Sequence, residues 1–276
     1  MLKQRVITGL ILAVVVATAI FVLPLTWFAG FVGLVLVAAL WEWADLAGIG
    51  CRPLRAIYCV VGIALMWLIG WGATVWTLPR ERVVGEVLLL AAGWWVLAAV
   101  LVITYPRSNA LWSRAWQRIL MGWLTLVPAG LAFVFLRAQA HGEWLLLFTV
   151  ALVAAADIGA YFAGTRFGRH KLAPHVSPGK SWEGFAGGLA ASLLLVVIVW
   201  ALVWRERFDL PALLAVAAVT VLGSVCGDLL ESMLKRQRGV KDSSNLLPGH
   251  GGVLDRLDSL SAAVPIFALG LLLMAA

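Results

Sequence analysis

Charged side chains are scarce in this sequence. Only 13% of its 276 residues are Asp, Glu, Lys or Arg, whereas 63% are hydrophobic. An average soluble domain has about 25% charged and about 45–50% apolar residues, so a single globular core would not hide this excess. The apolar residues come in blocks of about 20, the length that an α-helix needs to cross about 30 Å of hydrocarbon. The composition excludes an ordinary soluble domain and predicts an all-α, polytopic transmembrane protein.

Cysteine is also scarce, and no segment has the composition of a linker. The three cysteines, Cys51, Cys59 and Cys226, are scattered without metal-ligand spacing, which gives no indication of a zinc site or a disulfide framework. The sequence contains no repeat of fixed period and no low-complexity stretch. We therefore interpret residues 1–276 as a single transmembrane domain.

Nine apolar blocks are predicted to span the membrane. Pro24 and Leu25 leave almost no loop between the first two, so a merged or re-entrant segment is an alternative there. A cleaved signal peptide is a second alternative, but its small-x-small triplet, Ala17-Thr18-Ala19, lies inside the apolar run, which favours a retained span. The predicted spans are Val6–Leu23, Leu25–Leu46, Ala56–Thr77, Val83–Thr104, Ile119–Leu136, Glu143–Phe167, Glu183–Trp204, Leu210–Lys235 and Leu260–Ala275.

Lysine and arginine are divided unequally between the two sides that nine spans define. The side with the N-terminus and the loops after spans 2, 4, 6 and 8 holds 16 of the 21, and the other side holds five. The positive-inside rule makes the first side cytoplasmic. We therefore expect a multi-pass protein of the cell (inner, cytoplasmic) membrane, and we attribute the net charge of +7 to this asymmetry rather than to nucleic-acid binding.

Acidic residues interrupt the apolar pattern, and an ionisable group at membrane depth is by default a candidate functional residue. Asp157 lies about 21 Å, and Asp228 about 27 Å, from the outer end of its predicted span at 1.5 Å per residue. Both therefore belong to the cytoplasmic half of the bilayer, and each precedes a long polar loop. The acidic residues within or beside spans are Glu42, Asp45, Glu86, Asp157, Glu183, Asp228, Glu231, Asp255 and Asp258.

The first polar segment comprises residues 157–184. Its Gly-Lys-Ser at 179–181 is not a P-loop, because Pro174 stands where the first glycine of that motif would be. Small residues, hydroxyls and cations before a helix N-terminus nevertheless suit a phosphate group. A positively charged cytoplasmic anchor is the alternative interpretation. The candidate binding residues are Asp157, Tyr161, Ser177, Lys180 and Ser181.

The second polar segment, residues 223–260, is denser. Asp228, Ser232 and Lys235 share one helical stripe, although Lys235 also has Glu231 as an i, i+4 partner. Glycines around His250 predict a tight turn where backbone can approach a ligand, with a structural hydrogen bond as the alternative role of His250. The other candidates in this segment are Arg236, Lys241, Asp242, Gly251, Gly252, Asp255, Arg256 and Asp258.

Carboxylates, hydroxyls and cations thus gather on the cytoplasmic side. Oxygen ligands of this kind suit Mg²⁺, which usually takes one or two carboxylates and leaves its other positions to water and phosphate. The pattern predicts phosphate-transfer chemistry with one substrate arriving from the bilayer. The alternative is a secondary transporter of an anionic solute, which would place Asp157 and Asp228 at mid-membrane in two halves with paired broken helices.

Residues 232–258 resemble the signature of the phosphatidate cytidylyltransferases over its whole length. The shared positions are Ser232, Lys235-Arg236, Lys241-Asp242, the turn Pro248–Gly252, Asp255-Arg256 and Asp258. Asp157–Tyr161 and Ser177–Gly184 are also similar to segments of that family. A CDP-alcohol phosphotransferase, another Mg²⁺-dependent CDP-lipid enzyme, would need its own cluster of four aspartates on two helices, which this sequence does not contain.

The resemblance implies a transmembrane catalytic domain that converts CTP and phosphatidic acid into CDP-diacylglycerol and pyrophosphate, in phospholipid biosynthesis. It implies Mg²⁺ held by Asp228 and Asp255, with Ser232 and Asp258 near the metal, and suggests K⁺ as a second ion. It also implies a homodimer, for which no span shows a decisive small-xxx-small face. The alternative for the two aspartates is simple pairing, Asp228 with Lys235 and Asp255 with Arg256. The predicted catalytic residues are Asp228, Lys235, His250, Asp255 and Arg256, and the predicted phosphate contacts are Lys180, Lys235, Arg236, Lys241 and Arg256.

Overall fold

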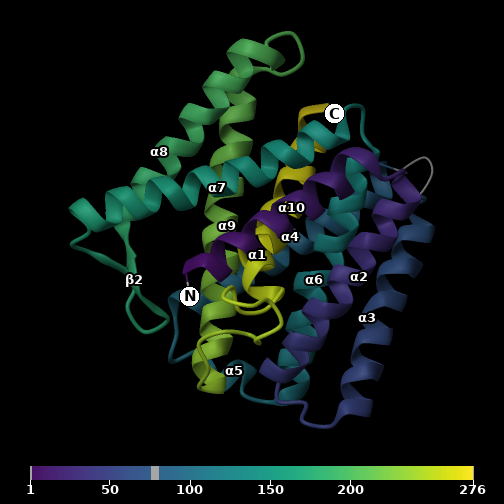
Figure 1. Cartoon of the computed structure of the whole chain (residues 1–276), viewed down its shortest axis with the longest axis vertical. Coiled ribbons are helices and arrows are strands. Elements are labelled where there is room, and N and C mark those ends of the chain that lie inside the picture. The colour runs from purple at the N-terminus through teal and green to yellow at the C-terminus, as the bar shows by residue number, and fades with distance from the viewer. Residues whose placement is uncertain (1, 76–80, 276) are drawn as a thin grey trace.

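The chain folds into a bundle of long helices with one short β-hairpin (Figure 1). The structure is a computed structural model that describes residues 2–75 and 81–275. Its elements are α1 (Leu2–Val22), α2 (Leu25–Leu46), α3 (Arg52–Gly72), α4 (Glu81–Ile103), α5 (Asn109–Trp112), α6 (Ala115–Ala138), α7 (Gly142–Phe167), β1 (Lys171–Ala173), β2 (Ser177–Ser181), α8 (Trp182–Val199), the π-helical turn η1 (Trp200–Trp204), α9 (Leu210–Arg238) and α10 (Leu254–Ala275).

The helices confirm the predicted all-α membrane fold. Within the described residues, eight of them, α2 to α4 and α6 to α10, are long and apolar enough to cross a bilayer. The first predicted span corresponds to α1, which contributes the shorter apolar stretch Val6–Val22. The predicted end of the third span, Thr77, lies outside the described residues. Large apolar side chains on the outside, among them Leu90, Ile103 and Leu202, are mostly exposed, as expected of a surface that faces lipid.

The last helix begins six residues before the predicted start at Leu260. An apolar run ends where polar residues begin, but α10 continues through Asp258 and Asp255 to Leu254. The extension is supported from elsewhere in the chain, because the carboxylate of Glu42 on α2 accepts the backbone N–H groups of Val253 and Leu254. Such groups at a helix start have no partner within the helix.

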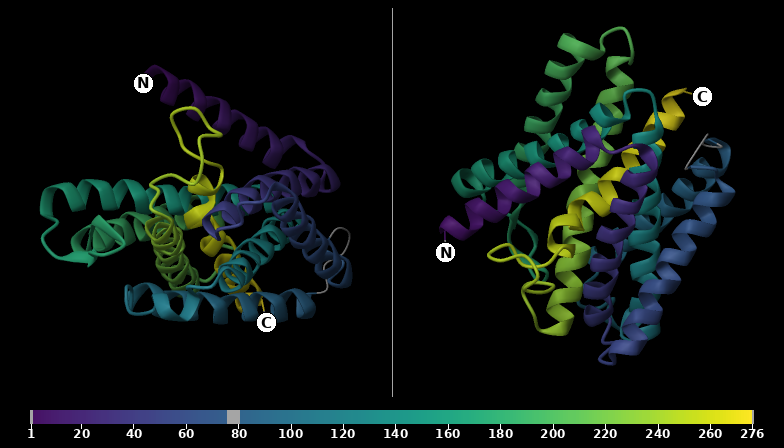
Figure 2. Two further views of the ribbon diagram at one scale, coloured as in Figure 1. Left: turned by 90° about the horizontal axis from the view of Figure 1, so that it is seen from below. Right: turned by 45° about the vertical axis from the view of Figure 1, so that its right-hand side comes forward.

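The loops sort to two ends of the bundle. The α2–α3 loop, α5 and the loop 239–253 lie toward the lower end in Figure 1, whereas the α8–α9 connection and the C-terminus lie at the upper end. This arrangement agrees with the alternation of loops between the two sides, on which the count of basic residues was based. In both views of Figure 2, α1 crosses the outside of the bundle obliquely, with loop 239–253 beside its N-terminal half. Thr8 Oγ1 donates to the carbonyl of Pro248 across this contact, at 3.1 Å.

Small residues bring α7 and α8 together as an antiparallel pair. A Cβ on Gly159 would lie 2.6 Å from the carbonyl oxygen of Gly187, and one on Gly188 would lie 2.5 Å from that of Ala156, so the two backbones are in direct contact. The contact uses residues four apart, a spacing that allows close approach of helices in lipid. No such face was singled out from the sequence as decisive for a homodimer, and the structure uses this one within the chain.

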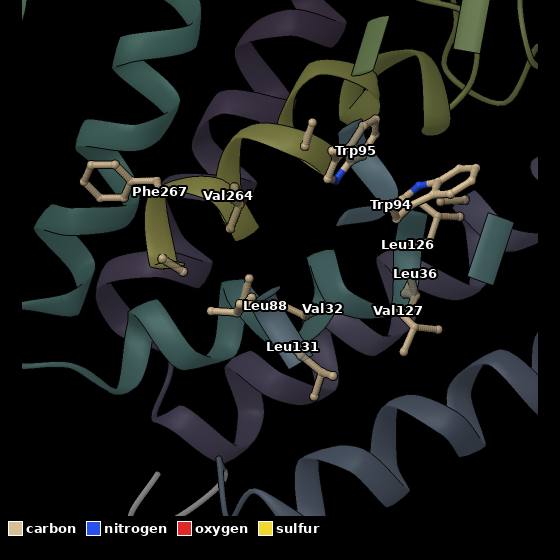
Figure 3. Packing of buried hydrophobic residues seen from close by; sticks show 14 of the residues in the cluster. Val32, Leu36, Leu88, Trp94, Trp95, Leu126, Val127, Leu131, Val264 and Phe267 are labelled. Carbon is tan, nitrogen blue, oxygen red and sulfur yellow. The ribbon is translucent and has the colours of Figure 1, made fainter. Parts of the chain in front are cut away.

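The buried core lies among α2, α4, α6 and α10. Figure 3 shows its side chains converging from these four helices, with Leu88, Trp94 and Trp95 on α4. The indole N–H of Trp94 donates to Thr125 Oγ1 at 3.1 Å, whereas the indole nitrogen of Trp95 is buried without a hydrogen-bond partner. This packed centre fixes α10, and therefore the acidic residues in its first turns, relative to α2.

Candidate active site

The predicted site residues lie where the second half of α9, the start of α10 and strand β2 approach one another. The β-hairpin is attached to α9 by Arg236, whose Nε donates to the carbonyl of Val176 at 3.2 Å. Loop 239–253 returns the chain from the end of α9 to the start of α10. Residues that are far apart in the sequence are thereby brought to one place near the end of the bundle that holds the basic loops.

Lys235 is the buried cation of the site. Its Nζ donates to Glu231 Oε1 at 3.0 Å and to Asp255 Oδ1 at 2.7 Å, which joins α9 to α10. The Lys235 residue is 8% exposed and Glu231 is 2% exposed. Charges this far from water need partners, because desolvating an unpaired ion costs several kcal/mol.

Asp228 pairs with the second cation, Lys180 from β2. Its other oxygen, Oδ1, accepts the hydroxyl of Ser232 one helical turn later, at 3.3 Å. Asp157 on α7 is close enough to interact electrostatically with both Lys180 and Asp228. The alternative of simple pairing, Asp228 with Lys235 and Asp255 with Arg256, is therefore wrong. Asp228 pairs with Lys180, and Asp255 pairs with Lys235.

Asp255 is held by the loop that precedes it. Its Oδ2 accepts the backbone N–H and hydroxyl of Ser243, both at 2.9 Å, and the N–H of Gly252 at 2.8 Å. Gly251 has a φ of +80°, and a Cβ there would lie 2.6 Å from the same oxygen. The two glycines are needed so that the backbone can wrap closely around the carboxylate.

The donor set fits Mg²⁺ only if substrate supplies further ligands. Asp258 lies within electrostatic reach of Asp228 and Lys235, and Glu231 Oε2 is a buried oxygen without a partner. In the described chain, however, no three Asp, Glu, His or Cys side chains are grouped closely enough to hold a metal ion together. Mg²⁺ commonly binds through one or two carboxylates plus water and phosphate oxygens, which agrees with the residues present.

Several other predicted residues have structural contacts. Both Nε and one terminal nitrogen of Arg256 donate to the carbonyl of His250, at 3.2 and 2.8 Å, and so brace the turn at 248–252. The His250 Nδ1 is buried without a hydrogen-bond partner. Ser181 is the N-cap of α8, since its hydroxyl accepts the N–H of Gly184 at 3.1 Å.

The remaining predicted residues lie on the surface around the cluster. Ser177 starts β2, and Lys241 and Asp242 are exposed in loop 239–253. Tyr161 is 67% exposed on α7, one turn beyond Asp157, where it contacts Phe162 edge to face. The structure thus places these four beside the paired lysines and aspartates rather than among them.

Glu42 is among the acidic residues of the predicted spans, but no role was assigned to it from the sequence. It is 3% exposed, and its carboxylate accepts hydrogen bonds from Ser243, Ser244, Val253 and Leu254. The available signal was a glutamate inside an apolar span. Its partners follow about 200 residues later, and no local pattern connects two such segments.

The fold and the cluster define a polytopic membrane protein whose lysines and carboxylates meet near one end of the helix bundle, an arrangement that suits a phosphate-transfer enzyme. Residues 3–274 match the family model described as the cytidylyltransferase family. The chain is 50% identical over 268 residues to the phosphatidate cytidylyltransferase of Pseudomonas aeruginosa, covering 97% of this chain and 96% of that one. It is 42% identical over 287 residues to that of Haemophilus influenzae (97% and 98%), and 31% identical over 275 residues to that of Bacillus subtilis (96% and 95%). The chain therefore belongs to the cytidylyltransferase family and is a membrane-bound nucleotidyltransferase.

Proposed function

We propose that this protein is a phosphatidate cytidylyltransferase, which transfers CMP from CTP to phosphatidic acid and releases pyrophosphate. The observation that carries the proposal is the match to enzymes of that name over 97% of the chain. The position of the lysine–carboxylate cluster supports it, because a lipid phosphate and a soluble nucleotide meet at the surface of a bilayer.

The reaction is an in-line displacement at phosphorus. A phosphate oxygen of phosphatidic acid forms a bond to the α-phosphorus of CTP, and the bond from that phosphorus to the bridging oxygen of the β-phosphate breaks. The bonding electrons leave with pyrophosphate. Such transfers need positioning and charge neutralisation more than covalent help from the protein.

The two lysines are the groups that neutralise this charge. Lys180 extends from the β-hairpin to Asp228, so an arriving polyphosphate competes with one carboxylate for its ammonium. Lys235 is fixed between Glu231 and Asp255, which keeps its ammonium in place as negative charge grows on the leaving group. Lys241 and Arg236 lie exposed near the same loop and are assigned to the outer phosphates.

Asp228 and Asp255, with Ser232 and Asp258 beside them, are assigned as the residues that hold Mg²⁺. When bound, Mg²⁺ supplies positive charge against the phosphate oxygens and offsets the repulsion among these carboxylates. A second, monovalent ion such as K⁺ is proposed on family resemblance alone, as is a homodimer.

The site is proposed to face the cytoplasm, where CTP is available. Support comes from the 16 basic residues assigned to that side, against five on the other.

An apolar groove of about 480 Å³ lies on the outer surface of α2. It is lined by Leu34, Val37 and Trp41 of α2 and by Leu246, and it reaches Glu42 and Ser244.

The test is an assay of purified protein in mixed micelles with CTP, phosphatidic acid and Mg²⁺. Equal amounts of CDP-diacylglycerol and pyrophosphate are expected. ATP and GTP in place of CTP should give little product, and phosphatidylglycerol in place of phosphatidic acid should give none. Absence of CDP-diacylglycerol with folded protein, or comparable turnover with ATP, would overturn the proposal.

A further inference from the structure

Glu42 is a buried carboxylate that the mechanism above does not use. It lies four residues before the end of α2, about 6 Å from that end at 1.5 Å per residue. Among the side chains that the structure describes, those of residues 6–75 and 81–275, no lysine or arginine forms an ion pair with it. A buried carboxylate without a cation is costly unless hydrogen bonds satisfy its lone pairs.

Four neutral groups, two for each oxygen, lie within hydrogen-bond distance of this carboxylate, and one of them, the Ser243 hydroxyl, shares its single proton with Asp255 Oδ2. Oε1 accepts the Ser244 hydroxyl at 2.6 Å and the Val253 N–H at 3.1 Å. Oε2 accepts the Ser243 hydroxyl at 3.1 Å and the Leu254 N–H at 2.7 Å. All four donors belong to loop 239–253 or to the first residue of α10, so one side chain of α2 binds two parts of the segment that resembles the family signature, residues 243–244 and residues 253–254.

The same segment holds Asp255. Ser243 Oγ lies 3.1 Å from Glu42 Oε2 and 2.9 Å from Asp255 Oδ2, and the Ser243 N–H bonds the same aspartate oxygen. The negative charge of Glu42 also lies at the N-terminus of α10, where the helix dipole is favourable to anions. Moving Glu42 therefore moves both the loop that wraps Asp255 and the helix that carries it.

We propose that Glu42 is a positioning residue for nucleotidyl transfer. It acts through Ser243 and the start of α10, and it fixes the Asp255 carboxylate against Lys235 without touching substrate. The catalytic part of this inference rests on the proposed function. The part that concerns the fixing of loop 239–253 by Glu42 rests on the contacts alone.

Glu42→Gln tests the inference because glutamine keeps the shape but replaces one oxygen by an NH₂ group. That arm no longer accepts hydrogen bonds, so the backbone N–H of Val253 or of Leu254 loses its acceptor whichever way the amide turns, and the serine hydroxyl on that arm can pair only by accepting. Glu86→Gln is the matched control, because Glu86 is an exposed carboxylate in α4 whose ion-pair partner among the described residues is Arg82. Hydrogen exchange of peptides covering 243–254, measured by mass spectrometry, should accelerate at least about fivefold in Glu42→Gln and remain unchanged in Glu86→Gln.

Steady-state kinetics distinguish a positioning role of Glu42 from a merely structural role. Glu42→Gln should lower kcat at least about 10-fold and change the KM for CTP by less than about threefold, with unchanged thermal stability in detergent. Ser243→Ala should lower kcat similarly, and the double variant should lie within about twofold of the slower single variant, because both act through one path. Ser244→Ala removes a bond that does not lead to Asp255, so its kcat should stay within about twofold of wild type.

Two kinetic results would overturn the inference. The first is a Glu42→Gln, Ser243→Ala double variant whose loss of kcat equals the product of the two single losses. The second is a kcat of Glu42→Gln within about twofold of wild type. Unchanged exchange of the loop in an active Glu42→Gln enzyme would do the same. A folded wild-type protein without CMP transfer would instead remove the proposed function and its catalytic part, while the exchange comparison would still decide whether Glu42 holds the loop.

Discussion

Gly252 leaves no room for a side chain, and this makes Gly252→Ala a direct test of how tightly the site is built. An added Cβ would lie 2.5 Å from Glu42 Oε2 and closer still to Ser243 Oγ. Ordinary contact begins near 3.4 Å, so the loop must move by about 1 Å. The glutamate oxygen cannot yield easily, because it is already bonded to Leu254.

The expected consequence is a loss of turnover rather than a loss of fold. A displacement of about 1 Å in a catalytic arrangement lowers the rate about 100-fold, equivalent to about 2.7 kcal/mol in the barrier. The Gly252 N–H also bonds Asp255, so the displacement reaches the carboxylate directly. We expect kcat of Gly252→Ala to fall by about two orders of magnitude, measured as CDP-diacylglycerol formed from labelled CTP.

Gly179→Ala is the matched control, because no atom lies within 4 Å of a Cβ at that position in β2. It should retain kcat within about twofold. Both variants should elute as monodisperse protein in detergent with similar melting temperatures. Wild-type turnover in Gly252→Ala, or equal losses in both variants, would refute the reasoning that the loop is rigid around Asp255.

Three further predictions follow from the site. Asp228→Asn and Asp255→Asn should each lower turnover at least about 100-fold at saturating Mg²⁺, about 2.7 kcal/mol in the barrier, and near-wild-type activity of Asp255→Asn would contradict its assignment. Lys180→Met should raise the KM for CTP at least about 10-fold, whereas Lys171→Met, a change of an exposed lysine in β1, should not; equal effects would argue against phosphate binding by Lys180. In a variant without the three native cysteines, an impermeant maleimide should label Glu206→Cys in intact cells and Gly179→Cys only after lysis; the reverse pattern would invert the topology.

The membrane fold could be predicted from the sequence because lipid imposes a simple rule. A helix that crosses hydrocarbon needs about 20 apolar residues, and that requirement is local. The prediction became less accurate where a distant partner decides the outcome. The start of α10 at Leu254 depends on Glu42, a residue of another helix, so the apolar run placed it at Leu260 instead.

The candidate site was predicted residue by residue but not pair by pair. Lys180, Asp228, Lys235 and Asp255 were selected from their segments, and the structure joins them in two ion pairs, Lys180 with Asp228 and Lys235 with Asp255. Their partners depend on how α9, α10 and β2 meet, which no spacing within one segment specifies. The α7–α8 contact was missed for a different reason: the residues four apart were present, but alanine and glycine are common in all membrane helices.

The contact between Glu42 and Ser243 joins two residues that are synthesised at widely separated times. These residues are 201 positions apart, and at about 5–20 residues per second a ribosome needs about 10–40 s to pass from one to the other. During that interval α2 is already synthesised, and its glutamate has none of its final partners. Its position about 6 Å from the helix end lets it stay hydrated at the membrane surface meanwhile. The last of those partners, Leu254, and Asp255 itself emerge only when the chain is nearly finished, so a prematurely terminated copy has no assembled site with which to consume CTP.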